Sequence, residues 1–189
     1  MKVIAILTLV IAAACTPAEK SDHPRLFFKT EDIQTLRFKA KSEAGSLIID
    51  QLRERLSAQK DALYLGSFAA GHGLLYHLTG DQNEAEKAAE IVKMVIKDEL
   101  SFMSDPDDPG SVTDIVLWNS TYKAIYRTPN IMGVAMAYDF CYDAWEEHFR
   151  QSVARELEDK VTDLLEGGGE GWNPNPWSNW HGITKVEVA

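Results

Sequence analysis

The sequence of 189 residues is short of cysteine, of basic residues and of long apolar runs. Its two cysteines, Cys15 and Cys141, are too few for a disulfide framework or for a cysteine-based metal site. The 29 acidic residues outnumber the 19 basic ones, and no Lys or Arg cluster is present to neutralise phosphates. This balance argues against nucleic acid as a partner. The apolar run from Val3 to Ile11 is too short for a transmembrane helix.

The first 22 residues have the pattern of an export signal followed by a tether. Lys2 precedes the apolar run, and the AAAC sequence that ends at Cys15 is similar to the cleavage box of bacterial lipoproteins. We therefore predict a signal peptide over 1–14, lipid attachment at Cys15 and a polar tether over 15–22. The protein is then exported and held at the membrane, in the periplasm or at the outer membrane, by its lipid. The alternative is an ordinary secretory signal that leaves Cys15 free.

After the tether, apolar residues recur at helical spacing. Thr30 is a capping residue for a first helix that has Ile33, Leu36 and Phe38 on its inner side, and Gly45 interrupts this helix. Gly80 followed by Asp81 predicts a helix end and a new start, with Glu84 on the outer face of the new helix. The remaining helices are expected over Leu47–Leu56, Tyr64–Leu78, Glu84–Lys97, Asn130–Trp145 and Glu146–Leu165.

These segments predict an all-α fold of antiparallel helical hairpins, which build either a solenoid or a closed α/α toroid. The small residues of the third helix, such as Gly66 and Gly73, permit close helix approach. We expect no strand, and we interpret residues 104–110 as a solvated turn. Cys141 lies on an apolar helix face and is predicted to be buried. His72 and His77 are five residues apart on one helix, so we predict structural roles for them and no metal site.

The stretch from Gly167 to Thr184 reads GGGEGWNPNPWSNWHGIT and fits no regular element. It holds three of the five tryptophans beside amide side chains and one histidine. Tryptophan faces stack on the C–H face of a sugar, and amides bond to its hydroxyl groups. The stretch is therefore typical of a loop that lines a sugar site. The alternative is a loop that buries its tryptophans for packing alone.

Four segments, in this order, resemble the N-terminal α/α-toroid region of the heparinase II/III-like and alginate-lyase-like polysaccharide lyases. The segments are HPRLFF (23–28), LLYHLTGDQNEAEKAAEIV (74–92), YRTPNIMGVAMAYDFCYDAW (126–145) and NPWSNWHGI (175–183). The resemblance implies an incomplete α/α toroid over 23–189, with the C-terminal part of the lyase absent. It also implies cleavage of an acidic polysaccharide by β-elimination, with no cofactor.

The resemblance also assigns candidate site residues. β-Elimination needs a donor that neutralises the uronate carboxylate, a base for the C5 proton and an acid for the leaving oxygen. Asn179 and His181 match the positions of the catalytic groups, with Asn179 on the carboxylate and His181 on the same carboxylate or on the proton. Trp177 and Trp180 are the expected sugar platforms, and Arg127 is expected to pair with a carboxylate or sulfate.

The sequence departs from the family pattern in two respects. A tryptophan separates Asn179 from His181, where some relatives place these residues side by side. The catalytic tyrosine of the family has no counterpart after His181. Tyr122 and Tyr126, which precede His181, are the candidate substitutes for this tyrosine. Two other functions therefore stay open, a non-catalytic glycan-binding lipoprotein and a helical scaffold lipoprotein without a sugar site.

Overall fold

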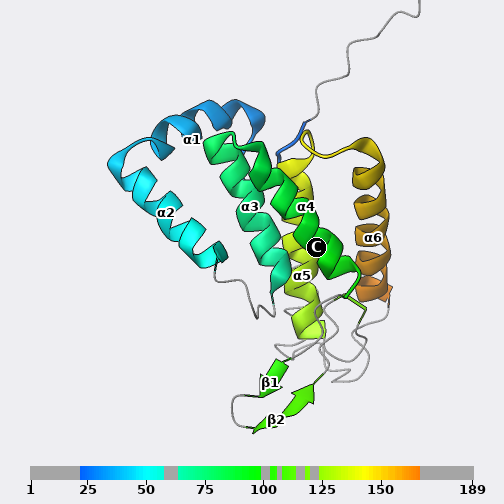
Figure 1. The fold of residues 1–189 in the computed structure, drawn as a ribbon. Helices are drawn as coiled ribbons and strands as arrows, with labels where there is room; N and C mark the ends of the chain where they lie inside the picture. The colour runs from blue at the N-terminus through cyan, green and yellow to red at the C-terminus, as the bar shows by residue number, and fades with distance from the viewer. Residues whose placement is uncertain are drawn as a thin grey trace, which may run out of the picture.

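The computed structural model describes residues 22–57, 64–98, 103–105, 108–113, 118–119 and 124–166. This part of the chain is helical, as predicted (Figure 1). A 3-10 turn, η1 (Thr30–Asp32), leads into the first helix. The helices are α1 (Ile33–Ala40), α2 (Glu43–Ser57), α3 (Leu65–Thr79), α4 (Gln82–Ile96), α5 (Ala124–Cys141) and α6 (Glu147–Glu166).

A short β-hairpin interrupts the helical order between α4 and α5. Strand β1 (Met103–Asp105) pairs antiparallel with β2 (Asp108–Thr113), with Ser104 opposite Val112. The expectation of a chain without strands is therefore wrong here, and residues 104–105 and 108–110 of the predicted turn lie in the two strands. Three of these strand residues are Pro or Asp, which are depleted in strands and common in turns. The sequence therefore predicts a turn and does not indicate that β1 and β2 pair.

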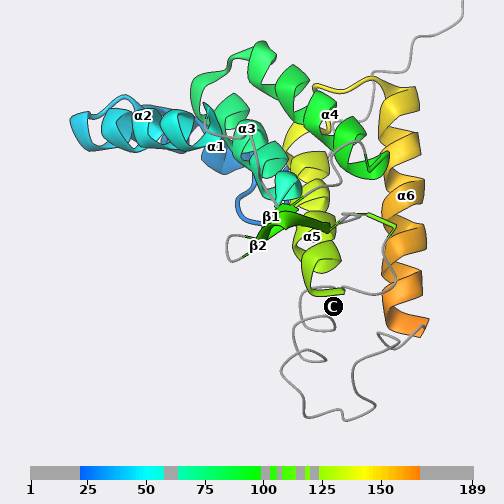
Figure 2. The same cartoon turned by 60° about the horizontal axis from the view of Figure 1, so that its bottom comes forward.

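Helix α3 lies at the centre of the arrangement (Figures 1 and 2). It packs against α4 and α5, while α1 and α2 contact it from another side and α6 contacts α5. The α3–α4 and α5–α6 pairs each form an antiparallel hairpin (Figure 1). No described helix has both the length and the apolar character needed to cross a membrane.

The turn between α3 and α4 has the geometry predicted from its two residues. Gly80 has φ 77°, in the left-handed region that favours glycine, and its N–H is donated to the carbonyl of Tyr76. The side chain of Asp81 accepts the N–H of Asn83 and so caps α4. A two-residue connection of this kind forces the two helices to run antiparallel.

The small residues of α3 allow its backbone to approach α5 closely. A Cβ atom on Gly66 would lie 2.4 Å from the carbonyl oxygen of Asn130, and one on Gly133 would lie 2.1 Å from the carbonyl carbon of Gly66. The prediction that these residues permit close helix approach is confirmed. The main apolar core forms around this contact and includes Leu65, Val92, Val134, Trp145 and Val153. Cys141 is fully buried in it, as predicted, and burial raises the pKa of its thiol.

The chain before α1 is fastened to the end of α5 by one carboxylate. Asp139, which is buried, lies 2.5 Å from Nδ1 of His23 and accepts the backbone N–H groups of Arg25 and Leu26. Phe28 follows and stacks on Phe140 with ring centroids 5.3 Å apart. Residues more than 110 positions apart in sequence thus form one polar clamp, which we call the Asp139 clamp.

Four local predictions are wrong. Thr30 does not cap α1, because it lies inside η1 and its hydroxyl donates to the carbonyl of His23. Phe38 was expected on the inner side of α1, but it is 80% exposed. The break between the first two helices falls at Lys41 and Ser42, and Gly45 lies inside α2, where its missing Cβ lets the backbone of Lys39 approach. Glu84 was expected to face solvent, but it is only 5% exposed, because partners on α3 and α4 hold it.

Candidate functional site

Most of the site residues predicted from the sequence lie outside the described residues. These are Cys15, Trp177, Asn179, Trp180 and His181. Arg127 lies within the described part, in the first turns of α5. The structure therefore places one of the predicted substrate-binding residues and leaves the catalytic pair as a prediction.

Arg127 is held against the last helix. Its side chain is buried, and Nη1 donates to Oδ2 of Asp163 on α6 at 2.7 Å. Its Nε is also buried and has no hydrogen-bond acceptor within the described part of the chain. A buried donor without an acceptor is costly, so the guanidinium retains the capacity to bond a further oxygen at this place. Asp163 is half exposed, which leaves one side of this ion pair facing solvent.

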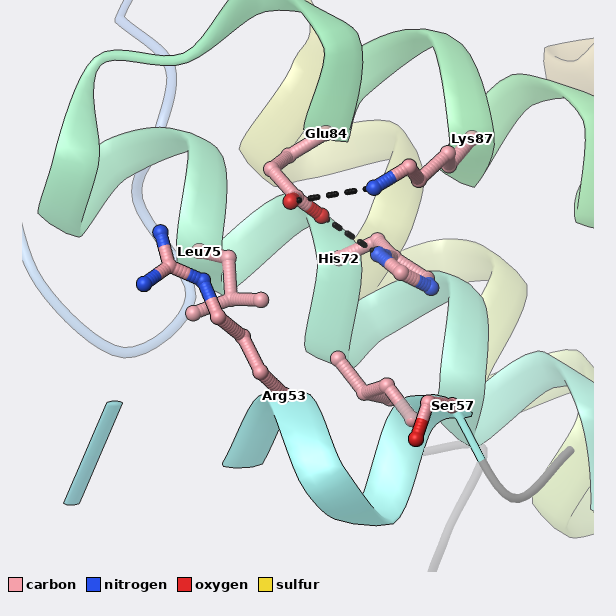
Figure 3. A pocket seen from close by; sticks show the side chains of 7 residues that line it. Arg53, Ser57, His72, Leu75, Glu84 and Lys87 are labelled. Atoms are coloured by element: carbon pink, nitrogen blue, oxygen red, sulfur yellow. Dashed lines mark hydrogen bonds and ion pairs between the residues drawn. The ribbon is translucent and has the colours of Figure 1, made fainter. Parts of the chain in front are cut away.

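A pocket of about 490 Å3 lies between α2, α3 and α4 (Figure 3). This volume is within the range of roughly 300–1,000 Å3 that is typical of ligand sites. Helix α2 contributes a cation, a hydroxyl and one apolar side chain, and α3 and α4 contribute the rest. The lining residues are Arg53, Leu56, Ser57, His72, Leu75, Glu84 and Lys87.

The carboxylate of Glu84 organises the polar side of this pocket. Its Oε2 lies 2.6 Å from Nδ1 of His72, and its Oε1 accepts Nζ of Lys87 at 3.2 Å (Figure 3). Burial by itself would raise the pKa of Glu84, but the hydrogen bonds from His72 and Lys87 outweigh it and lower the pKa below its ordinary value. Glu84 is therefore ionised near neutral pH and acts only as an acceptor.

The α3–α4 turn explains why these side chains meet. His72 and Glu84 are 12 residues apart, on opposite sides of the turn at Gly80 and Asp81. The tight turn folds α4 back along α3, and the side chain of Glu84, in the first turn of α4, reaches His72 in the middle of α3. Glu84 lies in the first turn of α4, where the helix dipole favours negative charge, and Lys87 lies one turn further on.

This geometry fixes the proton on His72. An ionised carboxylate cannot donate, so Nδ1 of His72 carries the hydrogen that lies between the two groups. In the neutral ring, Nε2 is then an acceptor, and no hydrogen bond from a described residue fills it. A histidine oriented in this way by a carboxylate can accept a hydrogen bond or a proton from a ligand hydroxyl.

A second pocket, of about 370 Å3, lies beside the Asp139 clamp. Its polar groups already serve the fold: Asp139 holds His23, and Nε of Arg37 donates to the carbonyl of His77 at 2.7 Å. Burial lowers the pKa of His77, so this ring is neutral in the folded protein at neutral pH. We assign this second pocket a structural role. In the described part of the chain, no group of three His, Cys, Asp or Glu side chains is placed to hold a metal ion.

The sequence analysis missed the pocket of Figure 3. It treated His72 as structural and placed Glu84 on the solvent face, because helical periodicity was taken for each helix separately. No local signal shows the pairing, because His72 lies eight residues before Gly80 and Glu84 four residues after it. Comparisons with protein-family models, with curated proteins and with solved structures gave no match.

Proposed function

We propose that this chain belongs to a polysaccharide lyase that cleaves uronate-containing glycans by β-elimination. The observation that carries the proposal is that three of the four segments with the lyase resemblance pack against one another. They meet at the helices α3, α4 and α5.

Three contacts join these segments. His23 of the first segment is held by Asp139 of the third, at 2.5 Å. Phe28 of the first segment packs edge-on against His77 of the second, with ring centroids 5.3 Å apart. Nε1 of Trp145, in the third segment, donates to the carbonyl of Ala85, in the second, at 2.9 Å. The three segments thus form one packed unit, as segments of a single lyase domain would.

The proposed reaction uses the groups of the fourth segment. His181 takes the C5 proton of the uronate, or shares with Asn179 the task of neutralising its carboxylate. The electron pair released from the C5–H bond forms the C4–C5 double bond, and the C4–O bond breaks. The leaving oxygen takes a proton from an acid, for which Tyr122 and Tyr126 are the candidates within this chain. Trp177 and Trp180 stack on the sugars, and Arg127 pairs with a carboxylate or sulfate.

The test is the formation of the unsaturated uronate product by the whole protein, followed by its ultraviolet absorbance. We expect Asn179→Ala and His181→Ala each to reduce turnover at least about a hundredfold, since general acid–base groups and charge-neutralising donors contribute about that much. His148→Ala is the matched control, because this histidine lies on α6 with its side chain 81% exposed. Its turnover is expected to equal that of the wild type.

Two outcomes overturn the proposal. If the Asn179 and His181 variants retain full turnover, the site assignment is wrong. If the wild-type protein binds acidic glycans saturably and releases no unsaturated product, the protein is a glycan-binding lipoprotein and not a lyase. Loss of that binding in Trp177→Ala would then identify the sugar platform.

A further inference from the structure

The pocket between α2, α3 and α4 carries positive charge in a protein with an excess of acidic residues. Its charged lining consists of two cations, Arg53 and Lys87, and one carboxylate, Glu84. The formal net charge of the whole chain is -10. The lining has one more cation than carboxylate, and Asp50, 3.8 Å from Arg53, balances this charge from outside the lining. Two cations in one pocket favour an anionic ligand that takes the place of Asp50, because local charge in a cleft determines which ions concentrate there.

Arg53 is available to a ligand. It projects from α2 into the pocket, and its own ion pair with Asp50 is long, at 3.8 Å, with both side chains about half or more exposed. An exposed pair of this geometry contributes little energy, so a ligand carboxylate can replace Asp50 at low cost. The guanidinium fork matches a carboxylate in a two-point contact.

The other walls suit the remaining parts of a sugar acid. When the ring of His72 is neutral, Nε2 is an acceptor for a hydroxyl hydrogen, since Glu84 fixes the opposite nitrogen as the donor. Leu56 and Leu75 provide an apolar surface for the C–H face of a ring. The hydroxyl of Ser57 already donates to the carbonyl of Glu54, and its lone pairs remain acceptors.

We propose that this pocket binds a single uronate residue, with its carboxylate on Arg53 and Lys87 and a hydroxyl on Nε2 of His72. The anionic character of the ligand follows from the pocket, and the choice of a uronate among hydroxylated acids rests on the proposed function. The role proposed for this pocket is to retain a sugar unit and not to cleave it.

The test is calorimetric titration of the full chain with glucuronate and, in parallel, with glucose, which has the same ring without the carboxylate. We expect glucuronate to bind at least tenfold more tightly than glucose. Arg53→Gln is expected to lower the glucuronate affinity about tenfold and to leave the fold intact, because this residue lies on the exposed face of α2. Arg55→Gln is the matched control, because Arg55 is exposed on the same helix and does not line the pocket.

A second measurement follows the imidazole nitrogens of His72 by NMR. Bound glucuronate is expected to shift Nε2, and glucose at equal concentration is expected to leave it unchanged. Equal affinity for the two sugars, an unchanged Nε2 signal with bound glucuronate, or an equal loss in Arg53→Gln and Arg55→Gln would overturn the assignment.

The outcome of these binding measurements is independent of the outcome of the lyase test. If Asn179→Ala and His181→Ala keep full turnover while Arg53→Gln has a lowered affinity for glucuronate, the catalytic assignment is wrong and the assignment of the pocket is supported. If the catalytic variants are inactive while Arg53→Gln binds glucuronate as the wild type does, the assignment of the pocket is wrong and the proposed lyase function is supported.

Discussion

The backbone N–H of Gly66 is donated to the side-chain oxygen of Asn130 across the contact between α3 and α5, at 2.8 Å. Both residues are buried, so this bond is formed away from water. It fixes the two central helices at the point where their backbones are closest. There is no room for a side chain at Gly66 in this contact.

Gly66→Ala is expected to destabilise the protein by about 3 kcal/mol, because its Cβ would lie 2.4 Å from a backbone carbonyl that no rotamer change can move. Gly71→Ala, on the same helix, meets only the end of the flexible Leu56 side chain, at 2.8 Å. It also gains helix propensity of about 1 kcal/mol, so its stability is expected to stay within about 1 kcal/mol of the wild type. Chemical denaturation of both variants checks this, and equal losses would contradict it.

Asp139→Ala is expected to cost about 3 kcal/mol, because it removes the buried acceptor of the Asp139 clamp and leaves three part-buried donors, one of them the His23 ring, without this partner. Asp159→Ala is the control, since Asp159 is exposed on α6. Its effect is expected to be below about 0.5 kcal/mol. Urea unfolding curves give both values, and a loss in Asp139→Ala no larger than the control would show that the clamp contributes no stability.

The stability that Glu84 provides is expected to depend on pH. Burial alone would raise the pKa of Glu84, yet the hydrogen bonds from His72 and Lys87 hold it below the ordinary value of 4.5. Its contribution is therefore fully present above pH 4.5 and is lost as the pH falls through the lowered pKa. Glu84→Gln is expected to be about 1–3 kcal/mol less stable at pH 7 and to converge with the wild type in acid. Unfolding free energies measured from pH 7 to 3 check this.

Glu90→Gln is the control for this series, because Glu90 is exposed on the same helix. Its profile is expected to follow that of the wild type at every pH. A Glu84→Gln profile that stays parallel to the wild type down to pH 3 would show that the carboxylate is not stabilised by its two partners.

His77 is expected to make stability depend on pH in the same direction as Glu84, in a higher pH range. Burial lowers the pKa of His77 below its ordinary value of 6.5, so the unfolded chain binds this proton first as the pH falls. The wild type is then fully stable above pH 6.5 with respect to this group and loses stability from there down to the lowered pKa. In His77→Gln this loss is expected to be absent, whereas exposed His148→Gln is expected to retain it. Thermal unfolding between pH 8 and 5 distinguishes the two profiles.

The α3–α4 hairpin was predictable because its signals are local. Gly80 and Asp81 determine the turn by their own backbone and capping preferences, and the structure has them as predicted. The apolar face of α4 repeats at helical spacing, so its buried side followed from the sequence. Turns and helix faces of this kind can be predicted from neighbouring residues without knowledge of distant contacts.

Contacts between distant residues were not predictable in the same way. The burial of Glu84 depends on His72, and the burial of Asp139 depends on His23, which is 116 residues away. Charged residues are normally solvated, so a single helix pattern places them outside. The exposure of Phe38 has the same origin, because helical periodicity does not show which side of a helix has a neighbour.

The Asp139 clamp also determines how the molecule responds to force. His23, Arg25 and Leu26 are joined to one carboxylate of α5, ahead of η1 and α1 in the chain. Tension applied between Asp22 and a point beyond α5 is therefore expected to pass through the clamp to α5 and to load α1 and α2 only after the clamp opens. A force applied in this way acts first on the central helices α3 and α5, and α1 and α2 are shielded from it.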